Sequence, residues 1–191
     1  MTKPEIQIAA VVGSLRSNSV NAAVLRAAAA NAPARTMIEP IDLAEVPLYN
    51  GDIEDRGEPA AVAALKQAVA AAAGLLIVTP EFNRSVPAVT KNTVDWLSRP
   101  HRAGALVDKP VGIVAVTPGP HNAVGVRSHL GIAVAANTQL LFPESLGISS
   151  VGDKLNKEGE LTDPGALDQL IGWLARFAAF VADSDTRANA A

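Results

Sequence analysis

The sequence predicts an α/β fold in which helices cover both faces of a five-stranded parallel sheet, giving a three-layer sandwich. Apolar runs that suit strands alternate five times with helix-like segments, which favours parallel strands joined by helical crossovers. The runs show little alternation of apolar and polar residues, as expected for strands buried on both faces. The chain has 191 residues, whereas a closed eight-stranded α/β barrel takes about 250. We therefore expect an open, doubly wound sheet with strand order 2-1-3-4-5.

Prolines and a glycine mark the element boundaries in the first half of the chain. Pro33 follows the first helix, because its ring cannot continue a helix. Pro59 suits the first turn of the second helix, and Gly74 ends that helix. The expected elements are a strand at 5–12, a helix at 19–32, a strand at 36–41, a loop at 42–57, a helix at 58–73 and a strand at 75–79.

The second half repeats the same alternation after a long loop from Pro80 to Pro87. Residues 152–163 are polar and are expected to form a surface turn. A single domain is expected over residues 1–182, with a frayed tail at 183–191. The expected elements are a helix at 88–98, a strand at 111–116, a helix at 124–136, a strand at 139–142 that could resume at 148–151, and a helix at 164–182.

Composition limits the classes of function. The net charge is −3 with acids and bases mixed along the chain, so we expect no nucleic-acid partner, which would need clustered cations. Without cysteine there are no disulfides or thiol redox chemistry, so any redox activity needs a bound cofactor. His121 and His129 lack ligand spacing, so no metal is expected. No apolar run reaches the roughly 18 residues of a membrane span and no signal peptide is evident, which predicts a soluble cytoplasmic protein.

The segment from Gly13 to Asn21 separates the first strand from the first helix and is rich in groups that bind phosphate. Backbone N–H groups converge at the start of the helix, where the partial positive charge favours anions. Arg16 adds a cation, and neutral donors come from Ser14, Ser17, Asn18, Ser19 and Asn21. Both G-x-x-x-x-G-K-S/T and G-x-G-x-x-G are missing, so the segment suits the terminal phosphate of a mononucleotide such as FMN. An ordinary N-capped helix is the alternative.

The run from Thr79 to Pro100 carries a resemblance to a known family. It is similar to the signature P-E-Y/F-N-x-S-x-P-x-x-x-K-N-x-I/V-D-W-x-S/T-R-P of the NADPH-dependent FMN reductases, which have a flavodoxin-like fold. Gly13 to Asn21 resembles the G-S-L-R-x-x-S-x-N motif of the same family. Thr117-Pro118-Gly119, with Gly125 and Arg127 after it, resembles a third family segment. The resemblance covers about residues 5–182.

The resemblance implies an FMN site formed by three loops. The first loop would hold the FMN phosphate through Ser14, Arg16, Ser19, Val20 and Asn21. The second would hold the ribityl chain and the isoalloxazine edge, largely through the backbone, with Pro80, Glu81, Phe82 and Asn83. Thr117 and Gly119 would close the other side of the ring. No catalytic side chain is implied, because the flavin itself carries the hydride chemistry.

Several residues depart from the family pattern. Phe82 stands where many members have Tyr, Thr117 replaces the usual Ser, and Val124 stands where Gly is common. Ser128-His129-Leu130 occupies a region where some members carry a Tyr that contacts another subunit. These changes affect the expected substrate choice and oligomer contacts rather than flavin binding. Family members are typically dimers or tetramers, which implies a homodimer or homotetramer, with the helix after the Pro80 loop near the interface.

Some of these residues also have purely structural interpretations. Glu81 is expected to cap a helix rather than act as a catalytic acid, and Lys91 and Asp95 suit a surface ion pair. Trp96 suits the core or a subunit interface. Arg99 and His101 suit the end of a helix, with a role at a neighbouring subunit's site as the alternative. The helical spacing of three aromatic residues predicts a core position for Trp173, Phe177 and Phe180.

The resemblance implies an oxidoreductase that takes a hydride from NADPH or NADH through bound FMN. The small-molecule acceptors would be quinones, flavins, azo compounds or metal oxyanions such as chromate. A non-enzymatic, flavodoxin-like electron carrier is the alternative, although such carriers are usually strongly acidic and this chain has a net charge of only −3. A third possibility is an interaction domain that has lost the flavin.

Overall fold

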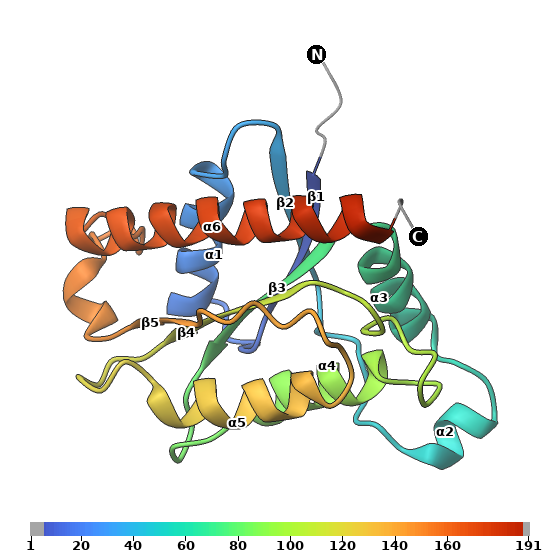
Figure 1. The fold of residues 1–191 in the computed structure, drawn as a ribbon. Helices are drawn as coiled ribbons and strands as arrows, with labels where there is room; N and C mark the ends of the chain where they lie inside the picture. The colour runs from blue at the N-terminus through green and yellow to red at the C-terminus, as the bar shows by residue number, and fades with distance from the viewer. Residues whose placement is uncertain (1–5, 189–191) are drawn as a thin grey trace.

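The structure, a computed structural model, describes residues 6–188 and contains the sheet that the sequence predicts (Figure 1). All neighbouring strands are parallel, in the order β2-β1-β3-β4-β5. The strands are β1 (Ile6–Val12), β2 (Thr36–Ile41), β3 (Gly74–Pro80), β4 (Val111–Val116) and β5 (Leu146–Ile148). The helices are α1 (Val20–Ala30), α2 (Gly51–Asp55), α3 (Ala60–Ala71), α4 (Ala88–Leu97), α5 (Val124–Ala135), the 3-10 helix η1 (Val151–Lys154) and α6 (Pro164–Ala188).

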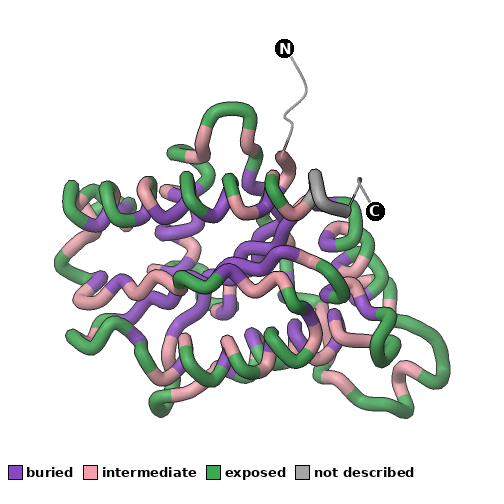
Figure 2. Tube along the Cα trace, in the orientation of Figure 1, coloured by how far each residue is buried: buried purple, intermediate pink, exposed green. Residues whose placement is uncertain are grey.

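Two apolar layers enclose the sheet, because successive residues of a strand point to opposite faces. On one face, Ile8 and Ala10 of β1 belong to a core shared with α1 and α6, including Val24 and Phe177. On the other face, alternate strand residues pack against α3, α4 and α5. Figure 1 shows α1 and α6 on one side and α3, α4 and α5 on the other. β3 and β4 are buried along their whole length, as predicted for strands with little alternation (Figure 2).

The last strand lies later in the chain than the sequence indicates. The run 139–142 was expected to be the strand, but it forms only an isolated bridge between Leu141 and Val111, and β5 follows at Leu146–Ile148. Phe142 instead packs its ring against Trp173 and the other aromatic residues of α6, at centroid distances of 5.3 to 5.6 Å. Pro143 has no N–H to donate, so strand pairing cannot continue through it.

Other boundaries differ in smaller ways. The expected loop 42–57 contains the short helix α2, capped by Asn50, whose Oδ1 accepts a hydrogen bond from Asp52 N at 2.9 Å. The expected surface turn at 152–163 overlaps η1. α6 extends to Ala188 rather than ending near residue 182, and residues 189–191 of the expected tail lie outside the described part of the chain. Among residues 6–188, no helix combines the length and apolar character needed to cross a bilayer.

Candidate active site

Three loops meet at one edge of the sheet, where β1, β3 and β4 end. The register pairs Val12 with Val78 and Pro80 with Val116, so these strands finish at nearly the same level. Gly13 N also donates to Val78 O at 2.8 Å, which ties the first loop to β3. In doubly wound sheets, ligands bind at this carboxyl edge, where the strand order reverses between β1 and β3. The sequence-predicted site residues therefore come from loops that the fold brings together (Figure 1).

The first loop leads into α1 through a capped helix N-terminus. Ser19 is the N-cap, and its Oγ accepts a hydrogen bond from Ala22 N at 3.3 Å. Its hydroxyl proton is not used by that bond and stays available to donate to a ligand. Arg16 is exposed, Ser14 and Val20 are half-buried, and the first turn of α1 contains no acidic residue to repel an anion. The capped-helix interpretation is thus correct for Ser19 and is compatible with phosphate binding.

Asn21 supplies an observation that fits a bound flavin phosphate. Its side chain is 3% exposed, and its Oδ1 has no hydrogen-bond partner within the described residues. Because the amide can be flipped, either its oxygen or its nitrogen can face this unsatisfied position. A buried polar atom without a partner costs about 1–3 kcal/mol. A phosphate or hydroxyl group of a ligand at the start of α1 would remove that cost.

The second loop contains a tight turn closed by backbone hydrogen bonds. Phe82 and Ser85 exchange two backbone hydrogen bonds of 3.2 and 2.9 Å. The two residues between them, Asn83 and Arg84, have positive φ angles of 50° and 61°. Side chains other than glycine adopt this conformation at a cost, and such positions concentrate at functional sites.

Glu81 caps the start of α5, in agreement with the helix-capping role expected from the sequence. Its Oε2 accepts a hydrogen bond from Val126 N at 2.9 Å, in the first turn of α5. Gly125 allows this approach, since a Cβ on that residue would lie 2.2 Å from Arg84 O. The carboxylate therefore joins the second loop to the helix that follows the third loop. The family motif includes Gly125 but does not reveal its contact with Arg84, because that contact depends on packing between distant segments.

The third loop is fixed by the chain around β5. Thr117 Oγ1 accepts a hydrogen bond from Gly119 N at 3.1 Å, and Thr117 N donates to Ile148 O at 2.9 Å. Arg127 bridges the segment to its neighbour, donating to Asn122 O and Ser145 O, each at 3.0 Å. These hydrogen bonds fix the positions of Thr117 and Gly119, and those of Arg127 join the third loop to the segment before β5.

Three large apolar side chains are exposed on these loops or directly after them, and we call them the apolar rim. Leu15, Phe82 and Val124 are 57%, 56% and 58% exposed, and each belongs to, or directly follows, one of the three loops. Large apolar side chains gathered at a loop cluster indicate a contact surface for a ligand or protein. Phe82 and Val124 depart from the family pattern, whereas no sequence pattern assigns a role to Leu15.

Two cations beside the first loop were also missed. A cavity of about 340 Å³ opens between residues 17–20 and the segment 155–159, and Arg26 and Lys157 line it. Arg26 Nη2 donates to Gly159 O at 3.4 Å, which joins the two walls. These residues lie outside every motif, so sequence patterns could not connect them with a phosphate site.

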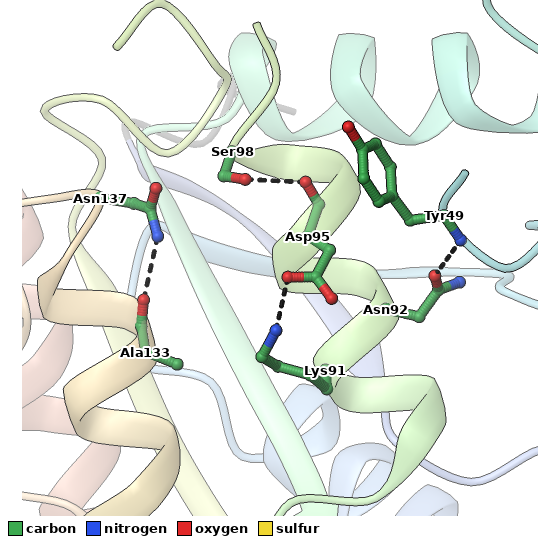
Figure 3. Close-up of polar contacts among 7 residues, drawn as sticks. All are labelled: Tyr49, Lys91, Asn92, Asp95, Ser98, Ala133 and Asn137. Atoms are coloured by element: carbon green, nitrogen blue, oxygen red, sulfur yellow. Dashed lines mark hydrogen bonds and ion pairs between the residues drawn. The ribbon is translucent and has the colours of Figure 1, made fainter. Parts of the chain in front are cut away.

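Residues of α4 and α6 that were expected to have structural roles have those roles in the structure. Lys91 and Asp95 form an ion pair of 2.6 Å, and Tyr49 N donates to Asn92 Oδ1 (Figure 3). Trp96 is fully buried, with its Nε1 donating to Pro47 O at 2.8 Å, so it belongs to the core of this chain. The aromatic residues of α6 pack as predicted, with Trp173 and Phe177 buried and Phe180 partly buried.

Comparison with known proteins decides the family. Residues 6–152 match the family described as NADPH-dependent FMN reductase. The chain belongs to this family. It is 35% identical to a 2-hydroxy-1,4-benzoquinone reductase of Burkholderia sp. over 93% of this chain and 97% of the relative. It is 37% identical to a quinone reductase of Escherichia coli over 93% of this chain and 96% of the relative.

A solved structure shows the same architecture. The NAD(P)H:(acceptor) oxidoreductase FerB of Paracoccus denitrificans, a flavoenzyme, superposes with a TM-score of 0.81 and is 25% identical. The match covers 94% of this chain and 98% of FerB. As an NADPH-dependent FMN reductase, the chain has the flavodoxin-like fold, and it is an oxidoreductase with FMN as cofactor and NAD(P)H as co-substrate. Family membership favours an enzyme over a passive electron carrier.

Replacing Glu81 with alanine tests its capping role in this FMN reductase. The variant leaves Val126 N without its acceptor and removes a negative charge from a helix start, so we expect a loss of about 1 kcal/mol in unfolding free energy. Glu81→Gln keeps an oxygen acceptor and is expected to lose less. Urea unfolding at saturating FMN measures both. A Gln variant that is fully stable but has lost most of its kcat would contradict the capping role and indicate a catalytic acid.

Proposed function

We propose that this FMN reductase reduces small planar acceptors, quinones first, at the expense of NADPH or NADH. The observation that carries this proposal is the open apolar rim of Leu15, Phe82 and Val124 at the sheet edge. Such a rim suits flat, weakly polar molecules and discriminates poorly among them. Two relatives named for quinone reduction support the same substrate class. Free flavins, azo compounds and metal oxyanions such as chromate are further acceptors in this proposal.

The chain's own residues would bind and orient the cofactor. In this proposal Arg16, the hydroxyls of Ser14 and Ser19, the amide of Asn21 and the backbone at Val20 hold the FMN phosphate. The backbone from Pro80 to Asn83 holds the ribityl chain and ring edge, and Thr117 with Gly119 closes the other side. FMN, when bound, supplies hydride acceptance from NAD(P)H and electron delivery to the acceptor. Backbone N–H groups of the loops can stabilise negative charge that develops at the ring edge.

Steady-state kinetics test the proposed activity. With FMN bound and no other reductase present, we expect 1,4-benzoquinone to stimulate NADPH oxidation. If NAD(P)H and the quinone bind in turn at the same site, double-reciprocal plots of rate against NADPH concentration, measured at several quinone concentrations, will be parallel. Failure of benzoquinone to stimulate NADPH and NADH oxidation, despite bound FMN, would overturn the proposal and favour the electron carrier.

We also propose that the protein is a homodimer or homotetramer in the cytoplasm, where NAD(P)H is supplied. Val124 and Ile132, two turns apart on α5, are 58% and 70% exposed and lie on one face of the helix. A second copy of the chain covering that face, beside α4, would bury them. Sedimentation equilibrium of the FMN-bound protein tests this proposal, and a monomer at micromolar concentration would contradict it.

A further inference from the structure

The turn in the second loop is held on both sides by the beginning of α5. On one side, the carboxylate of Glu81 accepts the hydrogen bond from Val126 N at 2.9 Å. On the other side, Ser85 Oγ and His129 Nδ1 share a hydrogen bond at 3.0 Å. Both contacts fall within the first two turns of the helix. α5 is therefore the element that fixes the position of this turn.

Ser85 links His129 to the backbone that is expected to hold the flavin ring. Ser85 N donates to Phe82 O at 2.9 Å, and Phe82 N donates to Ser85 O at 3.2 Å. Asn83 and Arg84 lie between them with positive φ angles. Residues other than glycine keep this conformation only where surrounding contacts hold them in it. A side chain that fixes Ser85 therefore also fixes the backbone of Phe82 and Asn83.

The two side chains are suited to a hydrogen bond that forms in either protonation state of the histidine. A hydroxyl group both donates and accepts, whereas an imidazole nitrogen accepts when it is bare and donates when it carries a proton. Within residues 6–188, the Ser85 hydroxyl and the His129 ring have each other as their hydrogen-bond partner. Because His129 is exposed and Ser85 is half-buried, water competes for these groups and the bond is of ordinary strength.

We propose that His129 is a positioning residue for the flavin, which acts through Ser85 to hold the turn from Phe82 to Ser85 in the conformation that receives the ring and ribityl chain. This inference rests on the cofactor position given under Proposed function. A loop that is already ordered spares the protein the cost of ordering it when the ligand binds. A neutral hydrogen bond of this kind corresponds to about a 2- to 10-fold change in affinity.

Two variants of matched polarity test the proposal by fluorescence titration with FMN and with riboflavin. An asparagine amide reaches the position of His129 Nδ1, whereas a glutamine amide reaches that of Nε2, so only His129→Asn keeps a partner for Ser85. We expect His129→Gln to weaken both flavins by the same factor, about 2- to 10-fold, because the second loop holds the parts that they share. His129→Asn should stay closer to wild type. Helix propensity alone would rank the two variants in the opposite order.

Removing the Ser85 hydroxyl separates this role of His129 from any other. In a Ser85→Ala background, His129→Asn and His129→Gln should bind FMN equally, because their partner is gone. In FMN-free protein, Ser85→Ala should also change the NMR shift of His129 Nδ1.

Three results would overturn the proposal. Equal FMN affinities of His129→Asn and His129→Gln in the presence of Ser85 would remove its basis, and an Nδ1 shift that ignores Ser85→Ala would deny the hydrogen bond. A changed Nδ1 shift with unchanged flavin affinity would instead place the flavin away from the second loop. Because turnover is not measured, failure of the proposed quinone reduction would leave this test intact.

Discussion

Replacing Gly13 with alanine is expected to destabilise the protein by at least about 2 kcal/mol and to weaken FMN binding tenfold or more. A Cβ at Gly13 would lie 2.0 Å from Thr90 Oγ1 and 2.9 Å from Thr79 Oγ1. These two hydroxyls are buried and hydrogen-bonded to each other at 2.8 Å. The loop cannot simply retreat, because Gly13 N is bonded to Val78 O. The added methyl group must therefore displace either the first loop or α4.

Two further variants make the Gly13 result specific. Gly152→Ala adds the same methyl group where no atom lies within 4 Å, so its stability should stay within about 0.5 kcal/mol of wild type. Removing the clashing Oγ1 through the double variant Gly13→Ala/Thr90→Ala is expected to recover part of the FMN affinity lost in Gly13→Ala. Urea unfolding and flavin fluorescence titration measure these effects. Equal stability of Gly13→Ala and Gly152→Ala would contradict the packing described here.

The combined variant Ser14→Ala/Arg16→Ala is expected to lose about 10- to 100-fold in FMN affinity. Charge-assisted hydrogen bonds contribute about 1.5–3 kcal/mol each, and this variant removes the cation of the first loop. Arg16 is exposed, so the free energy of unfolding without FMN should change little. Arg176→Gln, with the same change in charge, serves as the control. An FMN dissociation constant that matches the control would show that the first loop does not bind the phosphate.

The sequence was most informative where one local signal decides the structure. β3 was predictable because a continuous apolar run ends at Pro80, and the run is buried on both faces as expected. The last strand was misplaced because Phe142 is apolar for another reason, the aromatic cluster under α6. α2 was missed because Asn50-Gly51 is equally typical of a turn and of a helix cap.

At the candidate flavin site, too, local motifs were predictable from the sequence and contacts between distant segments were not. The three loops were found because each carries a contiguous motif, and the fold places them at one edge. Contacts between distant segments left no local signal. The close approach of Gly13 to Thr90, the cations Arg26 and Lys157, and the hydrogen bond between Ser85 and His129 all depend on packing between elements. Glu81 is an intermediate case, since a capping carboxylate was expected but its partner helix could be identified only in the fold.

The proposed position of FMN spans the three loops, with the phosphate in the first of them. Its most direct test compares FMN with riboflavin, which has the same ring and ribityl chain but lacks the phosphate. Wild-type protein should bind FMN at least about 100-fold more tightly than riboflavin, and Ser14→Ala/Arg16→Ala should lose most of that difference by weakening FMN binding alone. Equal affinities for the two flavins in the wild type, measured by fluorescence titration, would contradict the proposed position.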